Sequence, residues 1–270
     1  MSDIVRRYYN EQVQDEWKRL DNVYRRFELA STLRLIETYF PSGGRVADIG
    51  GGPGRYTVEL LRRGFRTTLV DLSEKAAAFA ERQLARLDLK PEDVFVADAR
   101  CLSMLETASY DAALQLGPMY HLIDREARAV ALAELHRILK PAAPAIVGFI
   151  NPWGVLRSGL TEFPDLYADA PLIWQLLHPF VQSGEQPVFT EAAFLTPPQA
   201  LTELREAGFA VECRAGVEGF ASGALGPVQA IAKRDPSAYE IVADLAAATS
   251  THVAFRDCTE HLHVVVRKIG

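Results

Sequence analysis

Short apolar segments alternate with helical patterns between residues 45 and 150, and this alternation constrains the fold more than any other feature of the sequence. Strands are expected at 45–50, 65–72, 93–98, 110–117 and 144–151, each a short apolar run bounded by turn signals. Helices are expected at 55–64, 73–89 and 124–139, with Ser73 as the cap of the second. Strands connected through helices run parallel with right-handed crossovers, so helices should cover both faces of one sheet.

The flanking regions extend this pattern. Apolar residues at three- and four-residue steps predict helical structure over 3–40. Residues 151–196 are expected to be irregular and rich in aromatic side chains. Further helices at 196–209 and 235–249 and strands at 210–220 and 260–268 complete the prediction. The fold class is therefore α/β, a doubly wound, mostly parallel sheet of seven strands with a helical N-terminal arm.

Charge and composition exclude several classes of partner. The 270 residues carry a net charge of −6, with acidic and basic residues mixed along the chain. Nucleic acid is not expected as a partner, because phosphate binding requires a clustered basic face. The N-terminus lacks the apolar segment of a signal peptide, and no apolar run reaches the roughly 20 residues of a membrane helix. The sequence therefore predicts a cytoplasmic protein without a membrane partner.

Cysteine and histidine spacing gives no metal site. Cys101, Cys213 and Cys258 are far apart in the sequence and show no zinc-ligand spacing. His261 and His263 would point to the same face of a strand, which permits a metal pair, but the sequence suggests no third ligand. We expect no metal.

The glycine-rich segment "DIGGGPG" connects the first strand to the first helix. Gly50, Gly52 and Gly54 allow positive φ angles and close approach of a ligand to the backbone at the carboxyl end of the sheet. The spacing fits neither the dinucleotide pattern, which needs a glycine at Arg55 or Thr57, nor a phosphate-binding Walker loop. The carboxylate of Asp48 would repel a pyrophosphate and suits a ligand with positive charge.

Four segments together resemble the class I S-adenosylmethionine-dependent methyltransferases. "DIGGGPG" is similar to the first motif of that family, and "LVDLS" and "VADAR" place Asp71 and Asp98 at the ends of the second and third strands. "ELHRILKPAAPAIVGF" is similar to the family's R-x-L-K-P-G-G turn, with Ala142 and Ala143 in place of the two glycines. The resemblance covers residues 40–150 most strongly.

The resemblance implies S-adenosylmethionine as the cofactor, S-adenosylhomocysteine as the product and a Rossmann-like methyltransferase fold. It places Asp48 near the ammonium of the cofactor and Asp71 at the ribose hydroxyls. It places Asp98 and the backbone of Ala99 at the adenine, with Leu72 against the ring. The backbone of Leu116 and Gly117 would complete the wall.

The segment "LGPMYHL" lies where this family places its acceptor. His121 is the candidate general base, because a histidine titrates near neutrality; the alternative is a histidine that caps a helix or holds the loop. Tyr120 would orient an acceptor, cover the cofactor or pack. The segment lacks the Asn/Asp-Pro-Pro-Tyr/Phe signature of enzymes that methylate base and glutamine nitrogens.

Two further regions should close the site. The resemblance implies an arm folded over the cofactor with a tyrosine near the methionine end; we take Tyr9 as the candidate, although the sequence does not decide between Tyr8 and Tyr9. The insert would form a lid over a modest organic acceptor, unless its rings only bury its own face, and His178 is a second base candidate. Its aromatic residues are Trp153, Phe163, Tyr167, Trp174, Phe180, Phe189 and Phe194.

The prediction is a single methyltransferase domain over residues 1–270. It comprises an arm (1–40), a cofactor-binding half (41–150), an acceptor lid (151–196) and the C-terminal part of the sheet (197–270). The expected reaction is in-line methyl transfer to a small acceptor whose reacting atom (O, S, N or C) is undecided, as is the oligomeric state. Alternatives are an RNA methyltransferase, an NAD-linked oxidoreductase, or a protein that binds the cofactor without transferring its methyl group. For the RNA alternative the sequence offers only Arg62, Arg63 and Arg66 as a tight basic cluster, toward the far end of the first helix after the loop.

Overall fold

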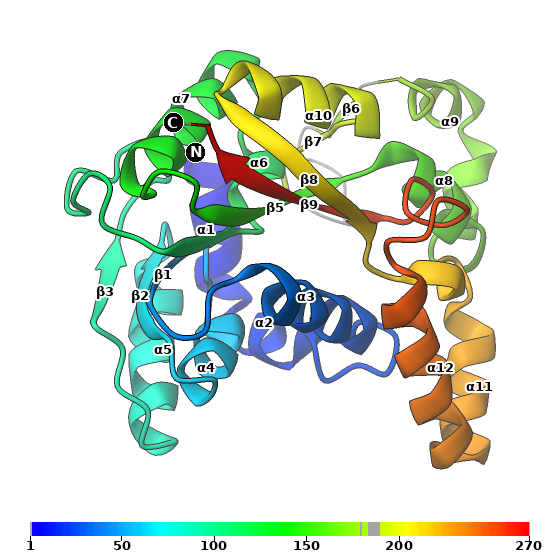
Figure 1. The fold of residues 1–270 in the computed structure, drawn as a ribbon. Helices are drawn as coiled ribbons and strands as arrows, with labels where there is room; N and C mark the ends of the chain where they lie inside the picture. The colour runs from blue at the N-terminus through cyan, green and yellow to red at the C-terminus, as the bar shows by residue number, and fades with distance from the viewer. Residues whose placement is uncertain (1, 179, 183–189, 270) are drawn as a thin grey trace.

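The computed structural model describes residues 2–178, 180–182 and 190–269, so Phe189 of the predicted insert lies outside the described residues. The described part of the chain forms one nine-stranded sheet with helices on both faces (Figure 1). The strands are β1 (Arg45–Ile49), β2 (Arg66–Asp71), β3 (Asp93–Val96), β4 (Ala112–Gln115), β5 (Pro144–Ile150), β6 (Phe180–Gln182), β7 (Ala192–Phe194), β8 (Phe209–Gly216) and β9 (His261–Lys268).

Strand order confirms the predicted fold class. Strands β3, β2, β1, β4 and β5 are parallel neighbours, β9 runs antiparallel to β5, and β8 runs antiparallel to β9. These are the seven strands expected from the sequence. The other two, β6 and β7, pair with each other and meet β5 only where Ile150 pairs with Phe194.

The predicted helices between the strands are present, and further helices occur beside them. The predicted arm is divided into three helices. The insert, predicted to be irregular, contains within its described residues two α-helices, a 3-10 helix (Pro164–Ala168) and two short strands. Helices α6 and α11 are also additional. The α-helices are α1 (Asp3–Glu11), α2 (Val13–Arg19), α3 (Arg26–Tyr39), α4 (Arg55–Arg62), α5 (Glu74–Arg86), α6 (Pro118–His121), α7 (Arg125–Ile138), α8 (Pro152–Glu162), α9 (Ala170–Gln175), α10 (Pro197–Glu206), α11 (Leu225–Arg234) and α12 (Pro236–Thr249).

Side-chain caps fix where several helices begin. The Ser73 hydroxyl accepts a hydrogen bond from the amide of Ala76 at 3.0 Å, which confirms the predicted cap of α5. At α10, Thr196 and Gln199 form a reciprocal capping box that spans the two prolines of the first turn. Asn151 caps α8 by accepting from the amide of Trp153.

The two faces of the sheet build two apolar cores. Along β5, Val147 packs with α7 and α10 on one face, while Ile146 packs with α3 and α4 on the other. This alternation follows from the two-residue period of a strand, and continuous apolar sequence is required because both faces are covered. In folds of this type a ligand binds outside the carboxyl ends of the parallel strands, which here are the ends of β1, β2 and β4.

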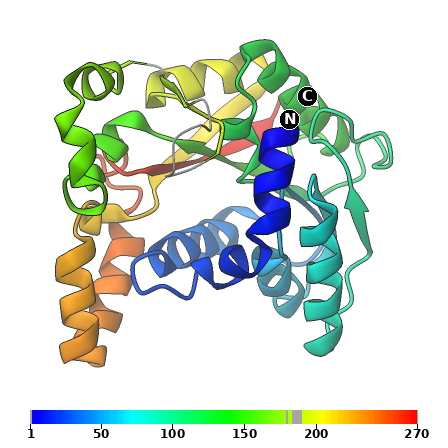
Figure 2. The same cartoon turned by 180° about the vertical axis from the view of Figure 1, so that it is seen from behind.

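The arm and the insert flank this carboxyl edge. Helix α1 packs against α5, and α3 packs against β9 and α12. Seen from behind in Figure 2, α1 runs beside α5 across the molecule, while α8 and α9 lie toward the opposite side. None of the helices within the described residues combines the length and apolar character that crossing a bilayer requires.

Candidate functional site

The glycine loop leaves β1 with three residues in left-handed conformations. The φ angles of Gly50, Gly52 and Gly54 are 71°, 54° and 89°. A β-carbon at Gly50 would lie 2.5 Å from Cδ of Pro118, whereas one at Gly52 would meet no atom within 4 Å. The loop therefore needs glycine at Gly50 for packing, and at Gly52 it borders open space.

Two buried carboxyl groups lie beneath this loop. Asp48 is 2% exposed and accepts a hydrogen bond from the hydroxyl of Thr57 at 2.6 Å. Asp71 accepts from the amides of Gly52 at 2.7 Å and Ser73 at 2.8 Å. Burial raises the pKa of each carboxyl group to about 6, and the charge of Asp71 adds to the shift of Asp48. Both groups are thus largely ionised at neutral pH and become protonated a little below it.

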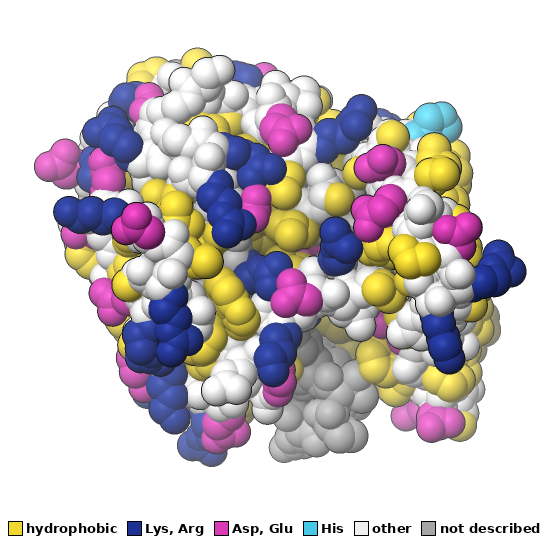
Figure 3. Space-filling view, turned by 90° about the horizontal axis from the view of Figure 1, so that it is seen from below, with side chains coloured by type: hydrophobic (Ala, Val, Ile, Leu, Met, Phe, Trp, Pro, Cys, Tyr) yellow, Lys and Arg dark blue, Asp and Glu magenta, His cyan; other side chains and the backbone are white. Residues whose placement is uncertain are grey.

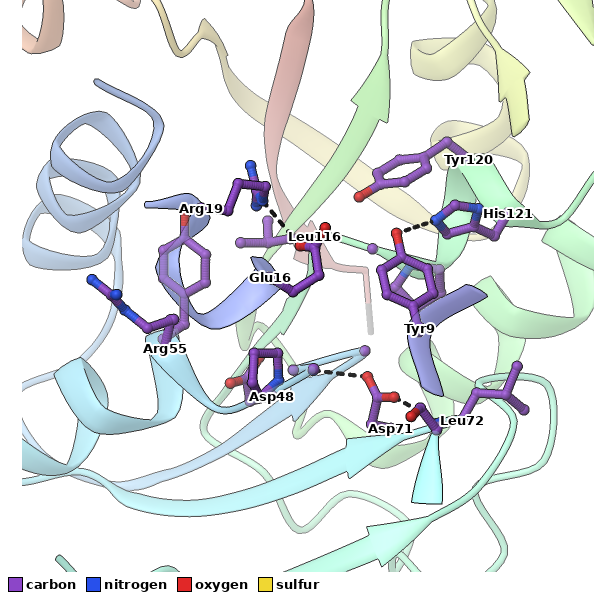
Figure 4. Close-up of a pocket in the computed structure, with 18 of the residues that line it drawn as sticks. Tyr9, Glu16, Arg19, Asp48, Arg55, Asp71, Leu72, Leu116, Tyr120 and His121 are labelled. Atoms are coloured by element: carbon purple, nitrogen blue, oxygen red, sulfur yellow. Dashed lines mark hydrogen bonds and ion pairs between the residues drawn. The ribbon is translucent and has the colours of Figure 1, made fainter. Parts of the chain in front are cut away.

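The structure brings ten of the thirteen predicted site residues to one cavity of about 980 Å³ (Figure 4). The ten are Tyr9, Asp48, Gly50, Gly52, Asp71, Leu72, Leu116, Gly117, Tyr120 and His121. We call this the loop cavity. Seven of the ten lie at strand ends or in the glycine loop, where the local sequence pattern fixes their place. Tyr9 lies on α1, and Tyr120 and His121 lie on α6.

The remaining three predicted residues do not line the loop cavity. Gly54 begins α4, and a β-carbon there would lie 3.1 Å from Cβ of Ala80. The carboxylate of Asp98 forms an ion pair with Arg100 at 2.8 Å. Burial opposes ionisation of Asp98, but the hydrogen bonds from Arg100 outweigh it and lower the pKa of this carboxyl group. Ala99 is 2% exposed within the core beneath the sheet.

The sequence predicts that His121 titrates near neutrality, but the structure places the pKa of its imidazole below that range. Its side chain is 4% exposed, and this burial lowers the pKa of the imidazole to about 4. Nδ1 lies 2.8 Å from the carbonyl oxygen of Glu191, and Nε2 lies 2.7 Å from the hydroxyl of Tyr9. A neutral ring facing a carbonyl must carry its proton on Nδ1, so Nε2 accepts from Tyr9.

A second cavity of about 1200 Å³ adjoins the first. The insert supplies Phe163, Phe180 and Phe194 together with Leu172 and Leu176 to its wall, and we call it the aromatic cavity. Five residues line both cavities: Tyr9, Glu16, Arg19, Tyr120 and His261. The two cavities therefore meet at the arm, at α6 and at the start of β9.

The other predicted aromatic residues of the insert lie elsewhere. Trp153 and Trp174 are 37% and 69% exposed, and the hydroxyl of Tyr167 donates to the carbonyl of Leu156. His178 is exposed and lines neither cavity. Nothing in the structure favours His178 as a base.

Residues 46–142 match the methyltransferase domain family. The S-adenosyl-L-methionine-dependent Diels-Alderase iccD of Talaromyces variabilis is 29% identical over 123 residues, covering 43% of this chain and 41% of that protein. A glycine/sarcosine N-methyltransferase of Parasynechococcus marenigrum (strain WH8102) is 31% identical over 164 residues, covering 58% of this chain and 56% of that protein. The chain thus spans about half the length of these two curated relatives.

The family match contains the glycine loop and the strand ends that form the loop cavity. Residues 46–142 therefore form a domain of the methyltransferase family. The fold around this domain extends over the whole chain. A 1,6-didemethyltoxoflavin-N1-methyltransferase of Burkholderia thailandensis, solved with 1,6-didemethyltoxoflavin and S-adenosylhomocysteine bound, shares it with a TM-score of 0.59 at 17% identity, over 99% of this chain and 88% of that one.

The arm contributes a charged wall that the sequence motifs miss. Arg19 of α2 pairs with Glu28 of α3 at 2.5 Å and with Glu16 at 3.1 Å (Figure 4). Burial opposes ionisation of Glu28, but Arg19 outweighs it and lowers the pKa of the carboxyl group. No motif marks these residues, because only the docking of the arm brings them to the cavity.

His261 and His263 face the loop cavity from β9, as their two-residue spacing predicts. Burial opposes protonation of His261, but the carboxylate of Glu218, 2.6 Å from Nδ1, raises the pKa of the ring. Burial lowers the pKa of His263 to about 4, and its Nδ1 lies 2.9 Å from the hydroxyl of Thr32. The pKa values of the two rings are therefore shifted in opposite directions.

Proposed function

We propose that this protein transfers a methyl group from S-adenosylmethionine to a small organic acceptor, within one methyltransferase domain that acts in the cytoplasm. The observation that carries the proposal is the meeting of the loop cavity with the aromatic cavity at Tyr9, Tyr120 and His261. One cavity has the family's cofactor motifs, and the other has the apolar wall of a site for a small organic molecule.

The residues of the loop cavity fit the cofactor. The open space at Gly52 leaves room for a ligand against the backbone. Each oxygen of Asp71 accepts one amide hydrogen and retains a lone pair, so the carboxylate can also accept hydrogen bonds from two ribose hydroxyls. Asp48 adds negative charge where the ammonium is expected. When bound, S-adenosylmethionine supplies a methyl group activated by a sulfonium.

On the acceptor side, the proposal assigns contact to Tyr9 and Tyr120 and positioning to His121. Because Nε2 of His121 accepts the Tyr9 proton, the Tyr9 oxygen can only accept from its other neighbours. Tyr120 also hydrogen-bonds with Tyr9, and a remaining lone pair of the Tyr9 oxygen can accept from an O–H, N–H or S–H group of the acceptor. Orientation of the acceptor is the main contribution expected of the protein, because methyl transfer from a sulfonium needs little covalent help.

The charged surface does not favour the RNA alternative. Arg62 and Arg63 pair with Glu59, and Arg66 pairs with Glu92. Figure 3 shows basic and acidic side chains interspersed over one face of the molecule. The family match likewise favours S-adenosylmethionine over a nicotinamide cofactor.

A second candidate is an S-adenosylmethionine-dependent cyclisation without methyl transfer. The similarity to a protein named as a Diels-Alderase favours it, and so does the apolar wall of the aromatic cavity, where a flexible apolar substrate could fold. In that case the cofactor would be bound but not consumed.

The test is transfer of a radiolabelled methyl group from S-adenosylmethionine to fractionated metabolite pools, with mass identification of the labelled product. Calorimetry with S-adenosylhomocysteine accompanies it. Labelled product together with cofactor binding supports methyl transfer. Binding without label in any pool supports the cyclisation candidate, and absence of binding contradicts both.

A further inference from the structure

A cluster of ionisable side chains lies beside the aromatic cavity where α8 ends and β9 begins. It consists of Glu162, Glu218, Glu260, Arg25 and His261, and we call it the acidic corner. Arg25 bridges two of the carboxylates, pairing with Glu162 at 2.8 Å and with Glu260 at 2.9 Å. Arg25, Glu260 and His261 line the aromatic cavity, so the corner is one end of that cavity.

The acidic corner has more acidic than basic groups. Three carboxyl groups face one guanidinium and one imidazole. At the junction of the two cavities, Arg19 is likewise shared between two carboxylates, Glu16 and Glu28. The polar wall of the aromatic cavity is thus suited to a cation.

One carboxylate of the corner has an unused acceptor. The side chain of Glu162 is 7% exposed, and while Oε2 accepts from Arg25, Oε1 has no hydrogen-bond partner among the described residues. A buried carboxylate oxygen without a donor is costly, so this corner of the structure favours added positive charge. Glu162 does not itself line the aromatic cavity; it acts there through Arg25, which does. Burial, with the charge of Glu260, raises the pKa of Glu162 to about 7, as expected when a cation is lacking.

A metal ion fits this corner less well than an organic cation. The possible ligand atoms of Glu218, Glu260 and His261 lie within 4.8 Å of one another. However, Nδ1 of His261 is already bonded to Glu218, and the guanidinium of Arg25 already contacts Glu260. A divalent ion would need several of these atoms as direct ligands and would have to displace their present partners, whereas an ammonium needs only lone pairs on the carboxylate oxygens.

We infer that the aromatic cavity binds an amine, with the ammonium at the acidic corner and the apolar body between Phe163, Phe180 and Phe194. The inference rests on the proposed function in that it names the acceptor class for the same site: an aryl- or alkylamine. It does not require the nitrogen to be the methylated atom. Aromatic faces around the body would add cation–π attraction to the amine end.

The test uses three probes of one shape and different charge. We would titrate 2-phenylethylamine, 2-phenylethanol and phenylacetate into the full chain by calorimetry, each with and without saturating S-adenosylhomocysteine. The amine should bind at least about tenfold more tightly than the alcohol, since its hydrogen bonds are charge-assisted, and the anion should bind most weakly. This comparison needs no variant.

Substitutions in the acidic corner then test whether the preference for the amine over the alcohol arises there. Glu162→Gln and Glu260→Gln should each reduce the ratio of amine to alcohol affinity several-fold, while leaving alcohol binding nearly unchanged. Glu81→Gln, at an exposed carboxylate on α5, is the matched control and should keep the wild-type ratio. Circular dichroism and thermal melting would verify that each variant is folded.

Three results would overturn the inference: equal affinity for amine and alcohol, no binding of any probe, or a preference that survives in both glutamine variants. Titration with Mg²⁺ and Zn²⁺ serves as the competing arm; tight metal binding lost in Glu260→Gln, with no amine preference, would assign the corner to a metal. Titrations without S-adenosylhomocysteine test the amine site independently. Failure of methyl transfer would contradict the proposed function and leave the result for the amine site standing.

Discussion

The Tyr9 hydroxyl donates to Nε2 of His121 across 2.7 Å, and Nδ1 of that imidazole lies 2.8 Å from the carbonyl oxygen of Glu191. One imidazole thus connects α1, α6 and the segment before β7, three parts of the chain that are far apart in sequence. The side chain of Ser2, at the start of α1, also contacts Glu191. The arm is therefore held across both cavities by side-chain hydrogen bonds.

We expect Tyr9→Phe to destabilise the protein by about 1–3 kcal/mol, because it removes the hydrogen bond that the Tyr9 hydroxyl makes with a buried imidazole. The free energy of unfolding in urea measures the loss. A double-mutant cycle with His121→Leu should give a coupling energy of about 1 kcal/mol between the two residues. Additive losses in the cycle would show that the contact contributes nothing.

We expect Asp71→Asn to weaken binding of S-adenosylhomocysteine by about tenfold or more, because charge-assisted hydrogen bonds to the ribose are lost. The pH dependence has a defined sign. Because burial raises the pKa of Asp71 to about 6, the carboxylate is ionised above that pH, and wild-type affinity should fall as the pH is lowered from 7 to 5.

Calorimetry at several pH values checks this prediction. The variant should show a shallower fall, with the remaining slope due to Asp48, whose pKa burial also raises to about 6. Affinity that is unchanged in Asp71→Asn at neutral pH would remove the ribose assignment.

The turn after α7 retains a conformation that its sequence does not favour. Ala143 donates to the carbonyl of Lys140 at 3.0 Å, and Ala142 at the third position of this turn has a φ of 61°. Glycine is preferred there because it lacks a β-carbon, and the family's motif has glycine at this position.

Ala142→Gly should therefore stabilise the protein by about 0.5–1 kcal/mol, the relief of strain being partly offset by the greater freedom of glycine in the unfolded chain. Ala143→Gly is the matched control and should destabilise, since Ala143 is buried and has an ordinary backbone conformation. Thermal unfolding compares the two. Equal destabilisation by both would show that the turn is unstrained.

Local signals determined how much of the fold was predictable. The seven predicted strands and the loop after β1 follow from apolar runs and glycine positions, which are readable within a few residues. The insert was harder: Asn151 and Pro152 form a standard helix start before α8, yet aromatic composition suggested irregular structure. Strands β6 and β7 are three residues each and depend on pairing with each other and with β5.

The residues of the candidate site also fall into those whose position the local sequence fixes and those that depend on tertiary packing. Seven of the ten predicted cavity residues lie at strand ends or in the loop, where motifs fix their place. Glu16, Arg19 and Glu28 reach the cavity only through the docking of the arm, and so does Tyr9, which the sequence did not distinguish from Tyr8. Asp98 shows a limit of motif reasoning, since Arg100, two residues later, occupies its carboxylate. The pKa of His121 depends on burial by the insert and the arm, which composition does not show.

Arg128 of α7 fixes the segment that carries Tyr120 and His121. Its guanidinium donates to both oxygens of Glu203 on α10, at 2.7 and 2.8 Å, and to the carbonyls of Leu122 and Ile123, each at 2.8 Å. Arg128 is 6% exposed, so these four bonds are shielded from water. A lysine in this position would have the same charge but would lack the planar guanidinium that donates these four hydrogen bonds.

We therefore expect Arg128→Lys to cost about 2–4 kcal/mol in the free energy of unfolding and to weaken acceptor binding more than cofactor binding, because the end of α6 loses its anchor. Arg125→Lys is the control on the same two helices: its ion pair with Glu206 is more than half exposed on both sides, and its loss should cost less than about 0.5 kcal/mol. Urea unfolding and amine titration of both variants measure these effects. If the two substitutions cost the same, Arg128 does not position α6.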